Sequence, residues 1–192
     1  SIAAAQIAAC GAKVIAVSDI TGGIVDNQGL DIPALMQHVQ KTGSISCFKK
    51  ATPVEKEEIF EIDCDILIPA ASGSQITIEN VKNIRAKIIA EGANAPTTPQ
   101  ADEILNQSGV FIIHDILCNA GGVFVSYLEY TQETQHEQMT LPQVEKRLFE
   151  QMKQRFNDVY DFAQQRKLTM REAAMDIAVS KVVEAVYVRG LL

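Results

Sequence analysis

The hydrophobic and polar positions of the first 113 residues form a repeated pattern of strand followed by helix. Short stretches whose central residues are continuously apolar, rather than alternating, occur at residues 13–19, 65–70, 87–91 and 110–113. Such runs are typical of strands buried on both faces of a parallel sheet. Because helix-like segments separate them, the pattern predicts an α/β domain whose mostly parallel sheet is covered by helices on both sides.

The segments between the predicted strands carry helix and turn signals. Residues 1–10 are rich in alanine, and Gly11 stands where a helix C-cap would. Asp31 is placed to cap a helix that runs to about Lys41. Helix, glycine, strand and acid in residues 1–19 are the latter part of a βαβ unit, which places the first strand of that unit before residue 1. Further helices are expected at 78–84 and after Thr98-Pro99, and turns at 21–23 and 26–29.

From Leu117 onward the pattern becomes helical. Apolar residues recur at steps of three and four from 141 to 163, which predicts one long amphipathic helix. Thr169 and Glu172 form a capping-box pattern that starts a final helix. We therefore expect one domain over residues 1–192. Its fold is a Rossmann-like, doubly wound, mostly parallel sheet lacking its first strand, with a mainly helical segment at 117–192 packed back on it.

The composition excludes several classes of protein. Hydrophobic residues make up 47% of the chain and charged residues 21%, as in ordinary globular domains. The formal net charge is -7 and the basic residues are scattered, so no nucleic-acid surface is expected. No apolar run approaches the roughly 18 residues that span a bilayer, so no membrane segment is expected. Residues 1–5 lack the basic leader of a signal peptide and start without Met, which favours a fragment.

Potential metal ligands and reactive thiols are dispersed. No two cysteines form a CxxC pair, and single thiols in apolar stretches are expected to be buried in a protein of a reducing compartment. The histidines supply no clustered ligands, so no structural metal is expected. The glutamates between residues 55 and 61 are expected to form a solvated face. The thiols and imidazoles are Cys10, Cys47, Cys64, Cys118, His38, His114 and His136.

Polar residues that follow the strands form the candidate site, because ligands of an open parallel sheet bind beyond the carboxyl ends of its strands. Asp19 ends the strand at 13–19. Its carboxylate can accept hydrogen bonds from both hydroxyls of an adenosine ribose and would repel a 2′-phosphate, which favours NAD over NADP. Alternatively, Asp19 only opens the turn after it. The remaining candidates are Ala70–Ser72, Glu91–Asn94 and Asp115–Asn119.

Two of these loops suit a flat ligand. Ala70 and Ala71 are small enough for a ring or a phosphate to approach the backbone, although a tight strand-to-helix turn would need the same residues. Asn94 lies in a loop with Gly92, and an amide can pair its donor and acceptor with a carboxamide such as that of nicotinamide. An asparagine selected for turn geometry is the alternative.

Two adjacent glycines mark the segment from Asn119 to Ser126. If this segment is helical, Asn119 and Ser126 share a face with Gly122. Glycine costs a helix about 1 kcal/mol relative to alanine, which indicates close approach of a ligand or of another helix. Asn119 suits polar groups of a cofactor, and Ser126 suits a substrate carboxylate. His114 and Asp115 point to opposite faces of a strand, so His114 is expected to be a satisfied structural histidine.

Four ordered blocks resemble the glutamate, leucine, phenylalanine and valine dehydrogenases, and the resemblance covers nearly the whole chain. The stretch Ser126-Tyr127-Leu128-Glu129-Tyr130 is similar to the glutamate enzymes, where a serine at this point helps to hold a carboxylate of the substrate. Ser126 therefore favours glutamate as the substrate. The four blocks are residues 12–24, 68–71, 91–98 and 115–123.

The resemblance implies reversible oxidative deamination of L-glutamate to 2-oxoglutarate and ammonia, with hydride passing to NAD or to NADP. It also implies a cytoplasmic homo-oligomer, often a hexamer. Asp19 would then hold the adenosine ribose, and Ala70 and Ala71 would line the cofactor cleft. Asn94 and Asn119 would face the nicotinamide end.

The chain also departs from the family pattern. The glycine-rich phosphate loop of the family precedes the helix at residues 1–10, and its catalytic lysine and aspartate belong to an N-terminal domain, so no residue here is assigned as the acid–base catalyst. We expect the isolated chain to have no dehydrogenase activity and to bind dinucleotide weakly or not at all. Without a middle strand the sheet would have two unpaired edges, which predicts dimerisation, swapping or rearrangement. A leucine, valine or phenylalanine dehydrogenase and a non-catalytic nucleotide-binding module are the alternatives.

Overall fold

The computed structural model describes residues 2–136 and 138–190. They divide into two compact units, the first made of residues 1–65 and 82–86 and the second of residues 66–81 and 87–192. Ser1, where the predicted first helix begins, lies outside the described residues. A single domain over residues 1–192 stays a prediction, and the two units are taken separately below.

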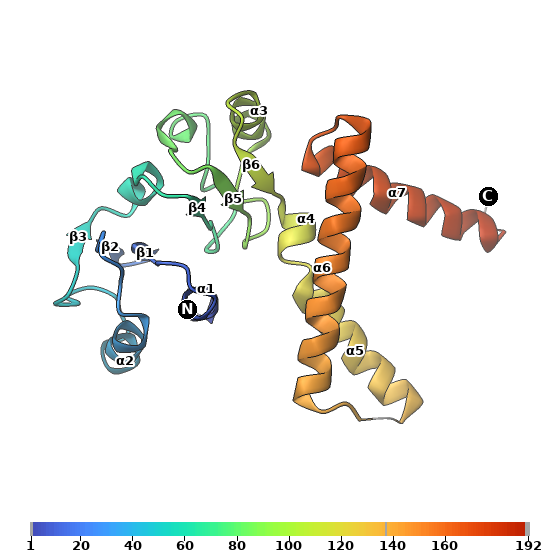
Figure 1. The fold of residues 1–192 in the computed structure, drawn as a ribbon, viewed down its shortest axis with the longest axis horizontal. Helices are drawn as coiled ribbons and strands as arrows, with labels where there is room; N and C mark the ends of the chain where they lie inside the picture. The colour runs from blue at the N-terminus through green and yellow to red at the C-terminus, as the bar shows by residue number, and fades with distance from the viewer. Residues whose placement is uncertain (1, 137, 191–192) are drawn as a thin grey trace. The chain divides into compact units, whose positions relative to one another are not determined.

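The first unit contains an antiparallel sheet of three strands (Figure 1). In this sheet β2 lies between β1 and β3 and pairs with both. The strands are β1 (Ala16–Asp19), β2 (Gly22–Val25) and β3 (Thr52–Val54). The helices are α1 (Ile2–Ala9), α2 (Ile32–Thr42) and the 3-10 helix η1 (Glu57–Glu61).

The hairpin of β1 and β2 corrects the sequence prediction. The glycines predict a turn over residues 21–23, but Gly22 and Gly23 lie in β2, and Asp19 pairs with Gly22. A Cβ atom on Gly23 would lie 2.8 Å from Cγ2 of Val54, so glycine lets β3 come close at this point. The predicted strand at 13–19 is therefore shorter than expected and belongs to an antiparallel sheet rather than to the parallel one.

The start and end of α2 follow local capping signals. The Ala34 amide donates to the Asp31 side chain at 3.0 Å, and Gly43 ends the helix in the left-handed region at φ 76°, as caps of these types do. The predicted cap at Asp31 is thus confirmed.

The buried core of this unit consists of Ile24, Leu30, Ile32, Leu35, Ile45 and Phe48.

The second unit is built on a parallel sheet with the order β4–β5–β6, which confirms the predicted parallel arrangement. Ile89 and Ile112 in its two longer strands are buried, whereas Ile66 in the edge strand is 48% exposed, so the sheet is not covered along its whole width. The strands are β4 (Ile66–Leu67), β5 (Ile88–Ala90) and β6 (Phe111–Ile113), and α3 (Pro99–Gln107) precedes β6.

The predicted helix at residues 78–84 is replaced by a single 3-10 turn, η2 (Val81–Asn83). The Asn80 side chain accepts a hydrogen bond from the Thr77 amide at 2.8 Å and donates to the Gln75 carbonyl at 2.8 Å. Such side-chain bonds to nearby backbone compete with regular helix, which explains the short turn.

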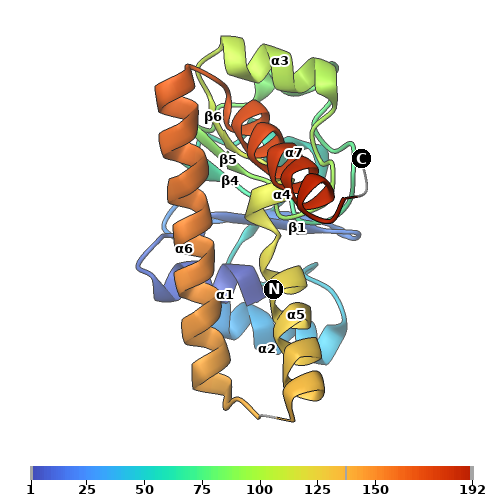
Figure 2. The ribbon, with the colours of Figure 1, turned by 90° about the vertical axis from the view of Figure 1, so that its right-hand side faces the viewer.

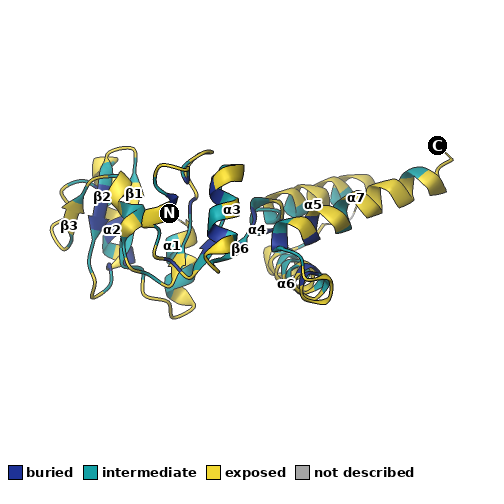
Figure 3. Ribbon diagram, turned by 90° about the horizontal axis from the view of Figure 1, so that it is seen from above, coloured by how far each residue is buried: buried dark blue, intermediate teal, exposed yellow. Residues whose placement is uncertain are grey.

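The chain after β6 is helical, as predicted, and packs on the parallel sheet. Figure 2 shows α5 alongside the first half of α6, and the two helices are in contact. Leu117, Val159, Ala163, Met170, Ala173 and Ala174 form a buried cluster with Phe111 and Ile113 of β6 packed against it. Along α7 only the first turns are buried, and most of the later turns are exposed (Figure 3). The helices are α4 (Asp115–Cys118), α5 (Gly121–Gln135), α6 (Leu141–Arg166) and α7 (Met170–Val188).

Both C-terminal helix starts use capping boxes. At α7, Thr169 accepts from the Glu172 amide at 3.2 Å, and Glu172 accepts from the Thr169 amide at 2.8 Å, which confirms the predicted box. Thr140 and Gln143 form the equivalent pair at α6. Within the described residues, no helix has both the length and the apolar character needed to cross a bilayer.

The prediction of four buried thiols is wrong for two of them. Cys10 and Cys47 are exposed because both lie in turns outside the helices, whereas Cys64 and Cys118 are partly buried. Burial raises the pKa of both partly buried thiols, and neighbouring carboxylates add to the rise. The glutamates at 55, 57, 58 and 61 are exposed, as predicted.

Candidate cofactor site

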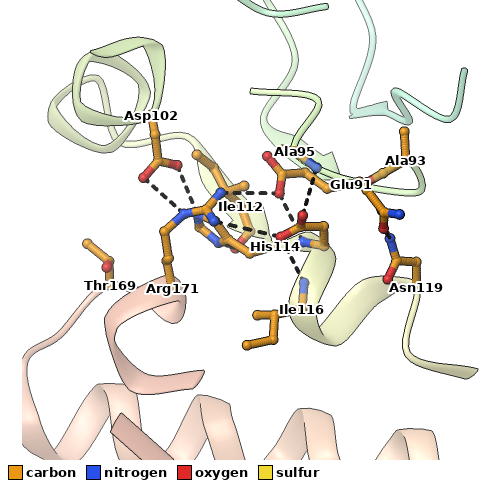
Figure 4. Close-up of polar contacts among 12 residues, drawn as sticks. Glu91, Ala93, Ala95, Asp102, Ile112, His114, Ile116, Asn119, Thr169 and Arg171 are labelled. Atoms are coloured by element: carbon orange, nitrogen blue, oxygen red, sulfur yellow. Dashed lines mark hydrogen bonds and ion pairs between the residues drawn. The ribbon is translucent and has the colours of Figure 1, made fainter. Parts of the chain in front are cut away.

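Charged side chains from four segments of the second unit converge at the carboxyl ends of β5 and β6 (Figure 4). Glu91 follows β5, and Asp115 follows β6 at the start of α4. Asp102 comes from the first turn of α3, and Arg171 comes from the first turn of α7. This edge is where the strand-end rule places a ligand, so the network lies at the candidate site.

Arg171 joins three carboxylates. Its Nη2 lies 3.3 Å from Oε2 of Glu91, its Nε 3.4 Å from Oδ2 of Asp102, and its Nη1 3.7 Å from Oδ1 of Asp115. The Glu91 side chain is 0% exposed, and its Oε2 also accepts from the Asp115 amide at 2.9 Å. The other oxygen, Oε1, is buried and accepts no hydrogen bond from the described residues. Arg171 is therefore the charged partner of a fully buried carboxylate.

His114 is held in place by a partner at each ring nitrogen. Its ring is 1% exposed, with Nε2 2.8 Å from Oδ1 of Asp102 and Nδ1 3.2 Å from the carbonyl oxygen of Ile112. Both partners are oxygens that can accept a hydrogen bond, so each ring nitrogen has a partner. The prediction of a satisfied structural histidine is confirmed.

Asp102 is a carboxylate beside the His114 ring. Burial alone raises the pKa of Asp102, but the hydrogen bond from His114 and the positive charges of His114 and Arg171 outweigh burial and hold the pKa below its usual value. The network thus places Arg171 and the His114 ring among three carboxylates.

The loop after β5 brings two asparagines together. Nδ2 of Asn119 donates to Oδ1 of Asn94 at 2.8 Å and to the Ala93 carbonyl at 3.3 Å. The Ala95 amide donates to Oδ2 of Asp115 at 2.7 Å. Ala95 has φ 44°, a left-handed conformation that is unfavourable for alanine, so the loop depends on such bonds for its shape. Asn94 and Asn119, which were separate candidates in the sequence, are direct partners.

The Ala70–Ser72 loop lies against the same asparagine loop. A Cβ atom on Gly92 would be 3.0 Å from Cβ of Ala70, and the Ala93 amide donates to the Pro69 carbonyl at 2.9 Å. Ala70 and Ala71 are exposed at this edge of the sheet. Small residues are required here by the approach of the two loops, whether or not a ligand also contacts them.

The helical face expected from Asn119 to Ser126 is only partly formed. Asn119 is the C-cap of α4 and lies outside α5, which begins at Gly121, so Asn119 does not share a helix face with Gly122 and Ser126. Gly122 and Ser126 are four residues apart within α5 and do share one face. Ser126 is exposed there.

Asp19 belongs to the first unit and stabilises the hairpin turn. Its Oδ1 accepts from the Thr21 amide at 2.7 Å and the Thr21 hydroxyl at 2.5 Å, and its Oδ2 accepts from the Ile45 amide at 3.2 Å. Burial raises the pKa of Asp19, but the bonds from Thr21 and Ile45 lower it more, so the group is a carboxylate at neutral pH. Asp19 therefore stabilises the turn, and a ribose contact stays a prediction.

The family model of the Glutamate/Leucine/Phenylalanine/Valine dehydrogenases matches residues 1–190. The chain belongs to this family. The resemblance found in the sequence is thereby confirmed.

Curated members of the dehydrogenase family are similar along the chain. A glutamate dehydrogenase of Thermotoga maritima is 42% identical over 181 residues, which are 94% of this chain and 44% of that protein. An NAD-specific glutamate dehydrogenase of Staphylococcus aureus is 40% identical over 180 residues, or 94% of this chain and 43% of that protein. The chain thus spans less than half the length of these relatives.

Solved dehydrogenase structures have the same fold. The hetero-hexameric glutamate dehydrogenase of Thermus thermophilus, in its leucine-bound form, superposes with a TM-score of 0.90 at 25% identity, covering 97% of this chain and 44% of that one. The glutamate dehydrogenase of Peptoniphilus asaccharolyticus gives a TM-score of 0.81 at 29% identity, covering 99% of this chain and 44% of that one. The Rossmann-like fold predicted from the sequence is confirmed.

Two members of the charged network were not found from the sequence. In the sequence, Asp102 is only an acid in the first turn of a predicted helix, where acids are favoured in any case. In the sequence, Arg171 lies within a capping-box segment. Nothing there links it to its partner Glu91, which lies 80 residues earlier. Glu91 and Asp115 did stand among the polar residues that follow strands, so the strand-end rule located two of the five members of the charged network.

Proposed function

We propose that this chain is the dinucleotide-binding part of an NAD-dependent glutamate dehydrogenase. The reaction is the reversible conversion of L-glutamate, water and NAD⁺ to 2-oxoglutarate, ammonium, NADH and a proton. Membership of the family and the similarity to proteins named glutamate dehydrogenase support this choice.

The paired amides of Asn94 and Asn119 carry the proposal. Their hydrogen bond uses Nδ2 of Asn119 and Oδ1 of Asn94, which leaves the amino group of Asn94 and the carbonyl oxygen of Asn119 outside it. One donor and one acceptor side by side match the carboxamide of nicotinamide. We assign both residues to the nicotinamide end of the cofactor, with Ala70 and Ala71 lining the same cleft.

Asp19 would hold the adenosine ribose. A carboxylate has about four acceptor positions, and three are used by Thr21 and Ile45, so it can still accept from a ribose hydroxyl. Its negative charge would repel a 2′-phosphate, which favours NAD over NADP. The relative in Staphylococcus aureus is named NAD-specific, in agreement with this choice.

Ser126 would contact a carboxylate of the substrate. It is exposed on α5 on the same face as Gly122, where a small residue leaves room for a ligand. A leucine, valine or phenylalanine dehydrogenase is the alternative within the family. The whole enzyme would be a cytoplasmic homo-oligomer, and the 192-residue chain alone would show no turnover.

The deciding experiment measures initial rates of NADH oxidation by the natural full-length polypeptide with ammonia. A rate that strongly favours 2-oxoglutarate over 2-oxoisocaproate is expected. Preference for 2-oxoisocaproate would assign the enzyme to the branched-chain group, and no rate with either acid would leave a non-catalytic nucleotide-binding module. Ser126→Ala should raise KM for 2-oxoglutarate more than KM for NADH.

A further inference from the structure

Arg171 is fixed at the start of α7 by the local sequence. The capping box of Thr169 and Glu172 defines the first turn of the helix, and Met170 next to Arg171 is part of the buried cluster that packs α7 on β6 and α4. Arg171 therefore extends from an anchored backbone toward the carboxyl ends of the strands (Figure 4).

A short path of bonds leads from Arg171 to the loop that carries Asn94. Arg171 contacts Oε2 of Glu91, and that same oxygen accepts from the Asp115 amide. Asp115 in turn accepts from the Ala95 amide at 2.7 Å. Three contacts thus join the guanidinium to Ala95, the residue next to Asn94.

The loop at this point needs external support. Ala95 holds a left-handed φ of 44°, its amide is bound by Asp115, and its carbonyl accepts from the Ser74 amide at 2.8 Å. Left-handed backbone costs a non-glycine residue about 1–2 kcal/mol, so weaker support would let the loop relax. A relaxed Ala95 would change the direction of the Asn94 side chain.

We propose that Arg171 is a positioning residue for the cofactor. By holding the carboxylates of Glu91 and Asp115 it fixes Ala95 in its left-handed conformation, and this directs the Asn94 amide toward the nicotinamide carboxamide. The inference rests on the proposed function, because it requires that Asn94 face nicotinamide.

A purely structural Arg171 would behave differently from a positioning one. Loss of a structural residue weakens binding of all ligands together, whereas loss of a positioning residue acts on the ligand part that Asn94 contacts. NADH and ADP-ribose separate these cases, because ADP-ribose has the adenosine, pyrophosphate and second ribose but no nicotinamide. The measured quantity is the ratio of the dissociation constants of NADH and ADP-ribose in the natural full-length protein.

The variants are Arg171→Met, Arg171→Lys and, as a matched control, Arg155→Met. Arg155 pairs with Asp158 on the exposed side of α6, so its loss removes a guanidinium of the same kind away from the sheet. Arg171→Met should raise the ratio about tenfold, because a misdirected Asn94 amide loses about one hydrogen bond to the nicotinamide carboxamide. Arg171→Lys should lie between, since it keeps the charge without the planar fork. Arg155→Met should leave the ratio unchanged.

A double variant tests the path itself. With Asn94→Ala already present, Arg171→Lys should no longer change the ratio, because the group being positioned is gone. Equal losses of NADH and ADP-ribose affinity, or no change in the ratio for either Arg171 variant, would overturn the inference. Failure of the unmodified protein to bind NADH would instead overturn the proposed function. If Arg171→Met does not fold, the lysine variant and the double variant still decide the question.

Discussion

Arg171 at the start of α7 contacts Glu91 at the end of β5, and this ion pair joins segments that lie 80 residues apart. Glu91 is completely buried, while Arg171 is 35% exposed. The buried carboxylate therefore depends on a cation that still reaches solvent. A carboxylate removed from water is costly unless it is paired, so the pair ties the C-terminal helices to the sheet edge.

Loss of this pair should destabilise the protein. Arg171→Met removes the guanidinium partner of the buried Glu91, and we expect the free energy of unfolding to fall by about 3 kcal/mol. Urea denaturation followed by circular dichroism measures the change. Arg155→Met removes an exposed pair on α6 and should cost no more than about 0.5 kcal/mol. Equal losses for the two variants would show that Glu91 does not need Arg171.

Asp102 should make stability depend on pH in the acid range. Its pKa in the folded protein lies below the usual 3.8, so the unfolded chain binds more protons there. The stabilisation is complete above that usual value and is lost as pH falls through the lower, folded value. Asp102→Asn should therefore flatten the fall of unfolding free energy with decreasing pH, measured by denaturation at a series of pH values. An unchanged slope would contradict the assignment.

The two glycines of α5 should respond differently to alanine. A Cβ atom on Gly121 would lie 3.2 Å from Cδ1 of Leu148, whereas on Gly122 it would meet nothing within 4 Å. Helix packing thus explains Gly121 and not Gly122. Gly122→Ala should keep or raise stability, by up to about 1 kcal/mol, but it should raise KM for the substrate if a ligand approaches there. Thermal denaturation and steady-state kinetics of the full-length protein test both parts.

Gly121→Ala serves as the control for that comparison. It should lower stability because Leu148 must shift, with kinetics affected less than in Gly122→Ala. Unchanged kinetics in Gly122→Ala would remove the reason to place a ligand at this face.

The four thiols should react in two groups. Cys10 and Cys47 are exposed, whereas Cys64 and Cys118 are partly buried and have a raised thiol pKa, so fewer of them are thiolate at a given pH. Alkylation with iodoacetamide near neutral pH should label the first pair before the second. Mass spectrometry of the labelled peptides reads the order, and rapid labelling of Cys118 would contradict its burial beside Glu91.

Elements that local residues define could be predicted from the sequence. Asp31 and Thr169 mark helix starts because a capping side chain bonds to backbone only two or three residues away. The hairpin of β1 and β2 was not predicted, because the need for glycine at Gly23 comes from its close approach to Val54 of β3, later in the chain. The sequence around two adjacent glycines does not show which distant side chain requires them.

The candidate site also has a part that could be predicted from the sequence and a part that could not. Asn94 and Asn119 were found separately because each follows a strand, and parallel strands bring their carboxyl ends together. Their hydrogen bond, and the convergence of Asp102 and Arg171 on His114 and Glu91, depend on how α3 and α7 pack. Such contacts form only in the folded chain, and no fixed spacing in the sequence marks them.

The buried ring of His114 has a practical consequence for spectroscopy. Both ring nitrogens have hydrogen-bond partners and the side chain is 1% exposed, so a proton on either nitrogen should exchange slowly with water and give a signal far downfield in a proton NMR spectrum. His136 is exposed, so it should not give such a signal. His114 is thus a native reporter at the junction of α3, β6 and α7, and any molecule that binds at the sheet edge should shift its resonance.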